Sequence, residues 1–474
     1  MMEKETKRFK LITLGCKVNQ FESACLRGAL LQAGWKEASK EGRADVNIVN
    51  SCIVTQRASY QTRQAIRKAN RESPSAMTAV IGCYAQVFPE EVSGLEGVSL
   101  VVGNSMKDRL PEMLLAERRP GTSGSNPPSP PPALFRASCA PSFLKSDMLF
   151  DVPPVPMFAG RTRGFLKVQD GCDAFCSYCI VPFARGGLRS LRPGKAISML
   201  RAFADQGCKE VVLTGIHLGK YGADLSGKTN LHGLFKLIQK ERLPLRIRLS
   251  SLEPMEVEEN LIHLVASEPW VCRHFHIPLQ SGDDSILRRM NRKYTSRDFA
   301  TLIERIRSRV PLAAIGVDVM VGFPGEGDRE FKNTFDLLTD LPISYLHVFP
   351  FSPRRGTAAF TLSGRVDEKE IKRRADLLRQ LGEEKRQAFY ASCLGKEFQV
   401  LVEGWKPGGR RCVRGFSDNY LPVFLPSARP LKNEFVSVRI QKVENNGVTG
   451  ALAPIQGPFL RITRASSAWA PPAP

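Results

Sequence analysis

The sequence lacks any hydrophobic run long enough to cross a membrane. Its most apolar stretch, residues 311–323, falls short of the roughly 20 residues that a spanning helix needs, and Asp318 interrupts it. The opening residues mix acidic and basic side chains and have no apolar core of the kind found in export signals. We therefore expect no membrane partner and a cytoplasmic location.

Acidic residues are scarce relative to basic ones. The 474-residue chain has 47 Asp and Glu against 68 Lys and Arg, which gives a formal net charge of +21. Such an excess favours a polyanionic partner such as a nucleic acid, with a membrane surface or a simple excess of surface Lys as the alternatives. The apolar fraction of 42% and the charged fraction of 24% are ordinary for a globular protein and exclude disorder throughout the chain. The length corresponds to about three domains.

The first part of the chain repeats a pattern of short apolar run, turn and helical stretch. The apolar runs are residues 10–14, 46–49, 78–81 and 100–102, and the segments between them are long enough for crossover helices such as residues 22–33. This pattern predicts an α/β domain with a parallel sheet over residues 1–117. Residues 118–157 begin with RRPGTSGSNPPSPPPA, a composition that predicts a linker.

A second series of alternating strands and helices follows. Its predicted strands are residues 164–169, 210–214, 246–250, 274–279, 315–321 and 344–349, and a long charged helix at 366–392 closes it. We therefore expect a partial (βα)6 barrel over residues 158–394. Short β-branched and aromatic runs then predict a small β-barrel over 395–458, followed by a tail over 459–474. The expected fold class is α/β: a parallel α/β domain, a partial barrel and a small β-barrel.

Three cysteines lie close together at the end of the first strand of the second series. Cys172, Cys176 and Cys179 have the spacing CxxxCxxC in the segment GCDAFCSYC. One disulfide would leave a thiol over, and a closed zinc site needs four ligands. Three thiolates suit an iron–sulfur cluster with one iron open to bind and reduce a small molecule. A zinc site completed by a remote His or Cys is the alternative.

Three further cysteines each follow a predicted strand of the first domain. Cys16 follows KLITLG, Cys52 follows NIVNS and Cys83 follows AVIG. Because the carboxyl ends of parallel strands share one edge of a sheet, we expect these thiols to gather there. They predict a second open iron site, with ordinary core cysteines as the alternative.

The segment around Cys172 resembles the radical S-adenosylmethionine (radical SAM) superfamily. With both cysteine trios in view, the chain resembles the methylthiotransferases of that superfamily, most closely the MtaB type that acts on tRNA. The resemblance extends from residue 11 to about residue 453. It is carried by LGCKVNQFES, NSCIVTQRA, GCYAQ, FLKVQDGCDAFCSYCIVPFARG, EVVLTGIHLGKYGADL, RIRLSSLEP, HIPLQSGDDSILRRMNRKY, DVMVGFPGE and HVFPFSPRRGT.

The resemblance implies two [4Fe–4S] clusters and S-adenosyl-L-methionine as cofactors. The trio Cys172, Cys176 and Cys179 would bind the catalytic cluster, at which the cofactor is reduced. The trio Cys16, Cys52 and Cys83 would bind an auxiliary cluster that carries the sulfur to be inserted. The small β-barrel resembles a TRAM domain, which is a tRNA-binding module.

Cofactor contacts are expected near the catalytic cluster. Tyr178 matches a family position near the adenine of the cofactor, and Gly215 a family position that contacts its amino group. The remaining candidates lie at the carboxyl ends of barrel strands, and each has a turn or capping role as its alternative: Thr214, Ser250, Glu253, Gln280 and Asp318. His274 and His276 share one face of a strand, where we expect structural packing rather than metal ligation.

Two segments are candidates for RNA contact. From residue 401 onward there are ten Lys and Arg against four Asp and Glu, a local net charge of +6, with Phe416, Tyr420 and Phe424 interleaved. This combination is typical of single-stranded RNA binding, although core aromatics would give the same pattern. Residues 161–195 carry seven basic and two acidic residues and predict a basic collar around the second trio.

The remaining cysteines match no cluster spacing: Cys25, Cys139, Cys208, Cys272, Cys393 and Cys412. We expect most of them to be plain buried thiols, and Cys139 to lie in a loop.

The resemblance implies an enzyme that transfers a methylthio group to carbon 2 of N6-threonylcarbamoyladenosine at tRNA position 37. Its expected partners are the tRNA anticodon stem-loop, an electron donor of flavodoxin or ferredoxin type, and a sulfur donor. One alternative is a methylthiotransferase for isopentenyladenosine tRNA or for a ribosomal-protein aspartate. The other is a non-catalytic zinc or iron–sulfur tRNA-binding protein.

Overall fold

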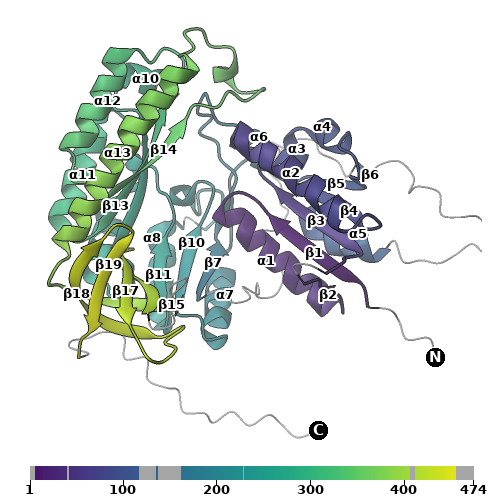
Figure 1. Cartoon of the computed structure of the whole chain (residues 1–474), viewed down its shortest axis with the longest axis horizontal. Coiled ribbons are helices and arrows are strands. Elements are labelled where there is room, and N and C mark those ends of the chain that lie inside the picture. The colour runs from purple at the N-terminus through teal and green to yellow at the C-terminus, as the bar shows by residue number, and fades with distance from the viewer. Residues whose placement is uncertain are drawn as a thin grey trace, which may run out of the picture.

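The computed structural model describes residues 6–39, 42–116, 135–136, 162–227, 229–405 and 412–454. Figure 1 shows three bodies: an N-terminal α/β domain, a larger half-open barrel beside it, and a small β-barrel at one end of the larger one. The expected fold class is confirmed. Within the described residues, no helix combines the length and the apolar character needed to cross a membrane.

The N-terminal domain is built on one six-stranded parallel sheet in the order β2-β1-β3-β4-β5-β6. Its strands are β1 (Arg8–Thr13), β2 (Lys36–Glu37), β3 (Val46–Ser51), β4 (Met77–Gly82), β5 (Leu100–Val102) and β6 (Phe135–Arg136). Its helices are α1 (Lys17–Gln32), α2 (Gln56–Glu72), α3 (Cys83–Val87), α4 (Pro89–Ser93) and α5 (Leu110–Ala116), with a 3-10 turn at Lys107–Arg109. The central strand β3 is buried at every position, as expected of a parallel strand covered on both faces.

Two differences from the sequence expectation concern this domain. Strand β6, which pairs with β5 in parallel, lies inside the segment 118–157 expected to be a linker. Most of that segment, including Cys139, lies outside the described residues, as does all of the predicted tail. Helix α1 begins at Lys17, five residues before the predicted helix, so that Cys16 is its N-cap residue.

The second body contains six parallel strands in two groups of three, β11-β10-β7 and β12-β13-β14. A parallel bridge from Ile247 to Val271 and a hydrogen bond from the Leu252 amide to the His276 carbonyl, 3.0 Å long, link the groups. The strands are β7 (Arg163–Lys167), β10 (Glu210–Thr214), β11 (Arg246–Leu249), β12 (His274–Gln280), β13 (Ala314–Val321) and β14 (Tyr345–Pro350), with a small antiparallel pair β8 (Gln169–Asp170) and β9 (Arg189–Ser190).

Helices cover the outer face of this partial barrel (Figure 1). They are α7 (Pro193–Asp205), α8 (Leu231–Glu241), α9 (Glu259–Ser267), α10 (Asp284–Arg289), α11 (Ser296–Arg309), α12 (Asp328–Asp340) and α13 (Glu368–Ser392), with 3-10 turns at Leu218–Lys220, Pro254–Glu256 and Ala358–Phe360. The short helix α6 (Val181–Arg185) lies instead against the N-terminal domain. The large core lies between these helices and the strands, where Phe275, Val317 and Leu346 are buried. The opposite face of β12, β13 and β14 is polar, because His276, Asp318 and His347 alternate with those core residues.

The small barrel is closed in the order β15-β16-β17-β19-β18. Its strands are β15 (Glu397–Trp405), β16 (Cys412–Ser417), β17 (Pro422–Pro426), β18 (Phe435–Glu444) and β19 (Gly447–Leu452). It is attached where β10 and β11 begin. There the Arg246 guanidinium donates to the carbonyls of Gln399 and Phe416, and Arg248 donates to those of Ser417 and Asp418.

The N-terminal domain is packed against the partial barrel through α1 and α3. Phe21 and Cys25 of α1 belong to the barrel core, whereas Leu26 and Leu30 of the same helix belong to the core of the N-terminal domain. Helix α3 packs on α6, which carries Ala184. Because α1 and α3 directly follow or contain Cys16 and Cys83, this packing fixes the position of the first cysteine trio relative to the barrel.

Candidate metal and cofactor centre

The first cysteine trio lies at the carboxyl edge of the N-terminal sheet. Strands β1, β3 and β4 are adjacent and parallel, and Cys16, Cys52 and Cys83 directly or closely follow their last residues. The charges of Cys16 and Cys83 both raise the pKa of Cys52, which places the three sulfur atoms in one neighbourhood. The topology therefore brings these cysteines together where the sequence predicted.

Gly15 allows the close approach of two of these cysteines. Its φ of +93° lies in the left-handed region, and a Cβ at this position would come within 2.8 Å of Cys52 Cβ and 2.9 Å of Cys52 Sγ. Both observations require glycine, because only glycine combines that backbone conformation with the missing side chain.

The second trio lies in the loop after β8. Gly171 begins this loop with a φ of +77°, and a Cβ there would be 1.8 Å from the Gly187 carbonyl oxygen. The loop is held by hydrogen bonds from the Cys172 amide to the Gly186 carbonyl and from the Cys179 amide to the Cys176 carbonyl, 3.0 and 2.9 Å long. Three thiols are thus presented by a loop whose backbone is fixed at both ends.

Two side chains that the sequence analysis did not single out contact this second trio. His217 Nδ1 lies 3.4 Å from Cys172 Sγ, and its Nε2 lies 2.7 Å from Glu256 Oε1. Burial alone would lower the pKa of His217, but Cys172 and Glu256 raise it to about 10. Arg292 Nη1 lies 3.3 Å from Cys176 Sγ, and the same guanidinium is paired with Glu253.

A buried network of charges joins the two trios. Arg185, at the end of the helix that follows Cys179, contacts Glu22 of α1 at 2.6 Å and Asp170 at 3.3 Å. Lys167 contacts the same two carboxylates at 2.7 and 3.0 Å, and Lys107 is paired with Glu22 as well. Burial alone would raise the pKa of Glu22, but the surrounding cations hold it well below the usual range.

Arg185 also acts on the first trio. The charges of Cys83 and Cys16 help raise its pKa, and its guanidinium donates to Asn19 Oδ1 at 2.5 Å. Asn104 adds a second bridge, because its Nδ2 lies 3.5 Å from Cys83 Sγ and 2.7 Å from the Ala184 carbonyl oxygen. The elements that carry the two trios are therefore bound directly to one another.

Burial affects the ionisation of several cysteines. Burial raises the pKa of Cys16, and raises those of Cys52 and Cys179 to about 11 and about 12. Burial has the same effect on Cys272, which lies outside both trios and whose pKa it raises to about 12. Cysteine binds metal as the thiolate, so a bound cation would offset this effect of burial. Cys16 is reached by solvent although protein surrounds it on most sides, as expected of a residue that lines a cavity.

The spacing of the thiols does not fit a tight zinc site. Among the described residues, only His276, Asp318 and His347 form a group of three potential ligand atoms within 4.8 Å of one another. In a tetrahedral zinc site with Zn–S bonds near 2.3 Å, the sulfur atoms would be only about 3.8 Å apart. Among the described residues, neither trio of thiols forms a group as close as that.

The predicted cofactor residues are placed as follows. Tyr178 is surrounded by protein, with its ring edge-on to Phe323. Thr214 ends β10 and is buried, and Gly215 follows it, so close to Gln169 that a Cβ would be 2.9 Å from Gln169 Oε1. Ser250 is also buried, and its hydroxyl has no hydrogen-bond partner in the described structure, which leaves it available to a polar group of a cofactor.

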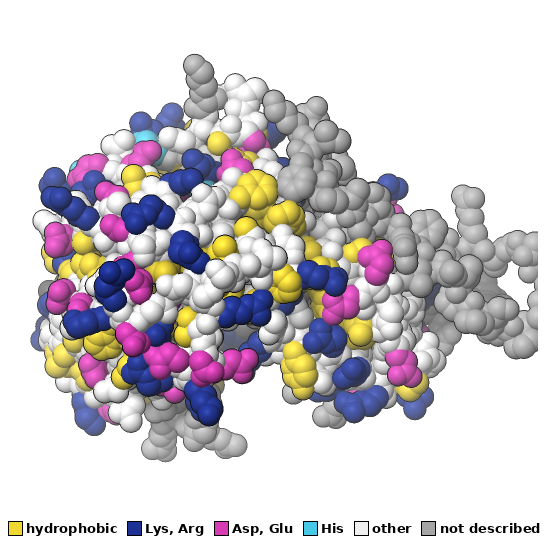
Figure 2. All heavy atoms as spheres, turned by 90° about the horizontal axis from the view of Figure 1, so that it is seen from above, with side chains coloured by type: hydrophobic (Ala, Val, Ile, Leu, Met, Phe, Trp, Pro, Cys, Tyr) yellow, Lys and Arg dark blue, Asp and Glu magenta, His cyan; other side chains and the backbone are white. Residues whose placement is uncertain are grey.

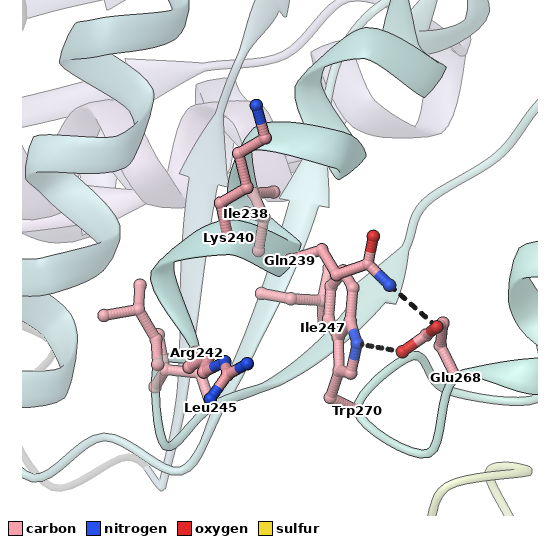
Figure 3. A pocket seen from close by; sticks show the side chains of 9 residues that line it. Ile238, Gln239, Lys240, Arg242, Leu245, Ile247, Glu268 and Trp270 are labelled. Carbon is pink, nitrogen blue, oxygen red and sulfur yellow. Dashed lines mark hydrogen bonds between the residues drawn. The ribbon is translucent and has the colours of Figure 1, made fainter.

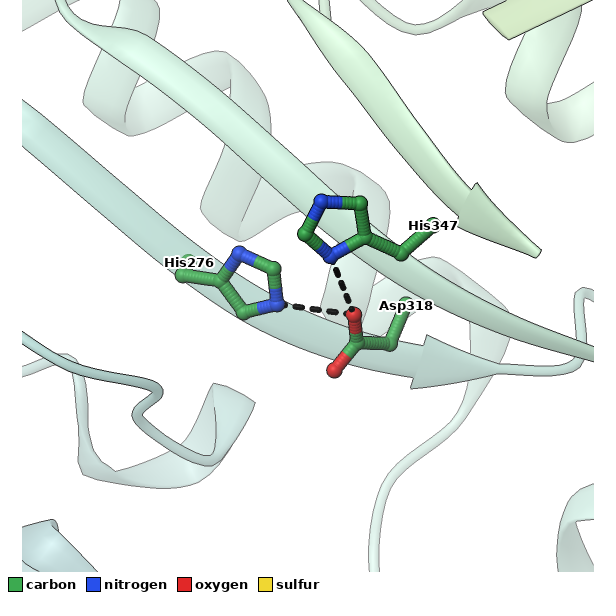
Figure 4. Close-up of side chains that lie close together, drawn as sticks. All are labelled: His276, Asp318 and His347. Carbon is green, nitrogen blue, oxygen red and sulfur yellow. Dashed lines mark hydrogen bonds and ion pairs between the residues drawn. The ribbon is translucent and has the colours of Figure 1, made fainter. Parts of the chain in front are cut away.

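Three other predicted cofactor residues have different surroundings. Glu253 accepts a hydrogen bond from Arg292, and the same guanidinium contacts Cys176 Sγ. Gln280 has a left-handed φ of +66° at a bulge of β12. Asp318 accepts from two histidines, at 2.7 Å from His276 Nε2 and 3.3 Å from His347 Nδ1 (Figure 4).

The histidine–aspartate group faces the N-terminal domain. Burial alone would raise the pKa of Asp318, but the two histidines hold it well below the usual range. His276 Nδ1 lies 3.4 Å from the Tyr345 hydroxyl, which also lies 2.8 Å from His274 Nε2. Burial lowers the pKa of Lys17 in α1, and the charge of Asp318 acts in the opposite direction. This polar face therefore lies close to the helix that follows Cys16.

The structure changes the picture of RNA contacts. Phe416 and Phe424 are buried, so neither ring is an exposed stacking face, and both lie beside the Arg414 guanidinium. Of the predicted basic collar, Lys167 and Arg185 are buried and paired with carboxylates, and Arg161 lies outside the described residues. Figure 2 shows that the face seen from above carries Lys, Arg, Asp and Glu side chains intermixed, around a hollow in the surface.

The other cysteines are free thiols where the structure describes them. Cys25, Cys272 and Cys393 are buried, and Cys208 and Cys412 are half-buried. This agrees with the expectation of plain buried thiols for three of the five.

A pocket of about 670 Å³ lies outside the partial barrel, between α8 and the start of β11. Figure 3 shows Trp270 and Gln239 both donating to Glu268 at its rim. None of the predicted site residues lines it, so the cysteine chemistry is located elsewhere.

Two known protein families match different parts of the chain. The Radical SAM superfamily matches residues 166–338, and the uncharacterized protein family UPF0004 matches residues 8–103. Among solved structures, the radical S-adenosylmethionine methyltransferase TsrM from Kitasatospora setae has a TM-score of 0.54 at 16% identity. That match covers 75% of this chain and 77% of TsrM, and it supports the fold alone.

Curated relatives match nearly the whole chain. A protein of Aquifex aeolicus named threonylcarbamoyladenosine tRNA methylthiotransferase MtaB is 39% identical over 393 residues, which cover 82% of this chain and 91% of the relative. The protein of the same name from Bacillus subtilis is 34% identical and covers 91% and 93%. A tRNA-2-methylthio-N(6)-dimethylallyladenosine synthase of Dictyoglomus thermophilum is 32% identical and covers 91% and 96%.

Proposed function

Because this chain belongs to the radical SAM tRNA methylthiotransferases of the MtaB type, we propose that it modifies N6-threonylcarbamoyladenosine at tRNA position 37. The reaction replaces the hydrogen on carbon 2 of the adenine with a methylthio group. Membership of this family makes the chain a tRNA methylthiotransferase that uses S-adenosyl-L-methionine and [4Fe–4S] clusters.

The observation that carries the proposal is the junction between the two cysteine trios. Glu22 follows Cys16 on α1, Arg185 follows Cys179 on α6, and their side chains meet at 2.6 Å in the protein interior. Asn104 ties Cys83 to the same helix. These contacts between the elements that carry the two trios support a site in which both clusters act on one substrate carbon.

We assign Cys172, Cys176 and Cys179 to the cluster that binds S-adenosylmethionine, and Cys16, Cys52 and Cys83 to the auxiliary cluster. When bound, these groups supply a carbon radical that removes hydrogen from an unactivated C–H bond, and the sulfur and methyl group that replace it.

The side chains around the catalytic trio hold the cofactor and the loop in place. Arg292 and His217 donate toward Cys176 and Cys172, which stabilises the thiolates and fixes their orientation. Ser250, with its free hydroxyl, and Thr214 and Gly215, at the adjoining strand end, are proposed to contact the cofactor, with Tyr178 beside its adenine.

We propose that the RNA presents a flipped or unpaired base to the two trios. Position 37 lies in the anticodon loop, where a base leaves the stack at less cost than in a duplex. We therefore propose the anticodon stem-loop as the RNA that is bound, in the cytoplasm where tRNA is used. A flavodoxin or ferredoxin and a separate sulfur donor are the proposed protein and chemical partners.

Nucleoside analysis of tRNA tests the proposal directly. A deletion strain should lose the 2-methylthio form of threonylcarbamoyladenosine and regain it with the wild-type gene. Unchanged levels of that nucleoside in the deletion strain would contradict the assignment.

A second assay separates the substrates. Reconstituted protein is given stem-loops with threonylcarbamoyladenosine or with isopentenyladenosine, and the products are identified by mass. We expect methylthiolation of the first only, whereas exclusive reaction of the second would favour the activity named for the Dictyoglomus relative. Stoichiometric zinc in place of iron, with no cofactor cleavage, would favour a binding protein instead.

A further inference from the structure

A second pocket, of about 620 Å³, lies between the N-terminal domain and the loop that follows β14. The start of α2 contributes Arg57, Tyr60 and Arg63 to its lining, and the loop after β14 contributes Arg354 and Arg355. Its size is that of a typical small-molecule or nucleotide site. No residue of either cysteine trio lines it, and none of the predicted cofactor residues does.

Arg354 is a buried cation that no carboxylate pairs with directly among the described residues, although the charge of Glu91 in the same pocket acts on it. Its side chain is only 7% exposed, yet among the described residues no carboxylate lies within ion-pair distance of it. Its Nη2 donates to the Ser59 hydroxyl at 2.9 Å, and its Nε has no partner at all. A buried guanidinium in this state is costly, and an anion in the pocket would relieve that cost.

The rest of the pocket is also electropositive. Arg57 and Arg355 are exposed, and Arg355 lies over the Phe88 ring at 5.0 Å. The only carboxylate in the lining is Glu91, which already accepts from Tyr84 and Arg63. Four guanidinium groups thus face one carboxylate that is already engaged.

The pocket adjoins the first cysteine trio. Helix α2 begins four residues after Cys52, and the charge of Cys52 acts on Arg354. The Gln56 amide donates to the Ser352 hydroxyl at 3.0 Å, which joins the start of α2 to the loop after β14. Tyr60, which is 55% exposed, adds an aromatic face of the kind on which unpaired bases stack.

We propose that this pocket binds an oxyanion of the tRNA substrate, with Arg354 as its central ligand and Arg57 and Arg355 at the rim. The proposal rests on the proposed function for the identity of the RNA. Two sources would present the same chemistry: a backbone phosphate next to the modified nucleotide, or the carboxylate of the threonylcarbamoyl group. A guanidinium binds either one through charge-assisted, bidentate hydrogen bonds.

The test measures the affinity of the reconstituted enzyme for two anticodon stem-loops, one with adenosine and one with threonylcarbamoyladenosine at position 37, over a range of KCl concentrations. Arg354→Gln is compared with the wild type, with Arg354→Lys, which retains the charge, and with Arg201→Gln on the exposed surface of α7. Thermal melting checks that each variant is folded.

A phosphate in the pocket predicts that Arg354→Gln weakens binding of both RNAs about tenfold and lowers the slope of log affinity against log salt by about one. A carboxylate predicts weakening for the modified RNA only. Arg354→Lys should keep most of the affinity, and Arg201→Gln all of it. Unchanged affinity and slope for both RNAs would overturn the proposal.

Arg57→Gln decides the question if Arg354→Gln does not fold, because Arg57 is exposed and its replacement leaves the core intact. A lowered salt slope supports the pocket, and an unchanged slope contradicts it. Wild-type enzyme that binds neither RNA would contradict the proposed function itself. Tight wild-type binding that is indifferent to these substitutions contradicts only the pocket.

Discussion

Gly15 is a position where one added methyl group should remove one metal centre. In Gly15→Ala, the new Cβ would clash with Cys52 Cβ and Sγ, in addition to the strain of a φ near +93°. We expect the reconstituted variant to contain about four iron atoms per chain instead of about eight. Iron and sulfide analysis measures this loss.

Gly34→Ala is the matched control for that substitution. Gly34 has a similar φ of +83°, but nothing lies within 4 Å of the position that its Cβ would take. Its alanine variant should lose about 1 kcal/mol of stability and keep all its iron. Equal iron contents in the two variants would contradict the expectation that the first metal centre depends on glycine at position 15.

Glu210 stabilises the junction between the two barrels from a fully buried position. It contacts Arg246 at 2.6 Å and Arg248 at 2.7 Å, and these arginines hold carbonyl groups of the small barrel. Glu210→Gln would leave two buried cations uncompensated, so we expect a loss of about 3–5 kcal/mol in the free energy of unfolding at pH 7. Glu397→Gln, which breaks a surface pair with Arg439, should cost less than about 1 kcal/mol.

The effect of Glu210→Gln should depend on pH. Burial alone would raise the pKa of Glu210, but Arg248 and Arg246 hold it well below the usual glutamate range. A lowered native pKa contributes stability above the unfolded pKa of about 4.3, and this contribution is lost as the pH falls further. Urea unfolding should therefore show the full difference at pH 7 and a smaller one below about pH 4. A difference that grows on acidification would contradict this account.

Single residues also mark the limit of what the sequence could tell. The cysteine trios were found because ligand spacing and strand ends are local signals. Arg185 and Glu22 are separated by 163 residues, and Arg354 and Ser59 by 295, so no periodicity links them. Phe416 was ambiguous for another reason. A phenylalanine in the sequence can be either buried or exposed for stacking, and only the structure shows that this one is buried.

At the scale of elements, strands and helices were predictable where hydrophobic patterns are regular. The buried run of β3 and the charged helix α13 were expected close to their observed bounds. The two-residue strands β2 and β6 were not expected, because so few residues carry no pattern of their own. They are the two edge strands of the sheet, and the three strands that precede the cysteines lie between them.

The contact between helix α12 and the loop after β12 gives a prediction at this scale. A Cβ on Gly282 would lie 2.6 Å from Thr334 Cα, a backbone atom that cannot rotate away. Gly282→Ala should therefore lower the free energy of unfolding by about 1–3 kcal/mol, measured by urea denaturation. Gly194→Ala in α7, where nothing lies within 4 Å, should be neutral or stabilising. Equal stabilities of the two variants would contradict the close approach of α12.

At the scale of the whole molecule, the arrangement of two bodies around one site could not be read from the sequence. Regular patterns predicted each body, but their docking depends on α1, which has one face in each core, and on the buried charges around Glu22. Such contacts join segments that are far apart in the chain. They bind the elements that carry the two cysteine trios to one another.

This arrangement predicts that the two metal centres can be removed one at a time. Cys52→Ala should halve the iron content and abolish methylthiolation, yet leave the protein able to cleave S-adenosylmethionine, because Cys172, Cys176 and Cys179 lie in a loop anchored within the barrel. Cys176→Ala should also halve the iron but abolish cleavage. Cys208→Ala, which removes a half-buried thiol outside both trios, is the control and should change neither quantity. Iron analysis and a chromatographic assay of deoxyadenosine measure the two effects. An equal loss of cofactor cleavage in Cys52→Ala and Cys176→Ala would contradict the prediction and mean that the two trios depend on each other.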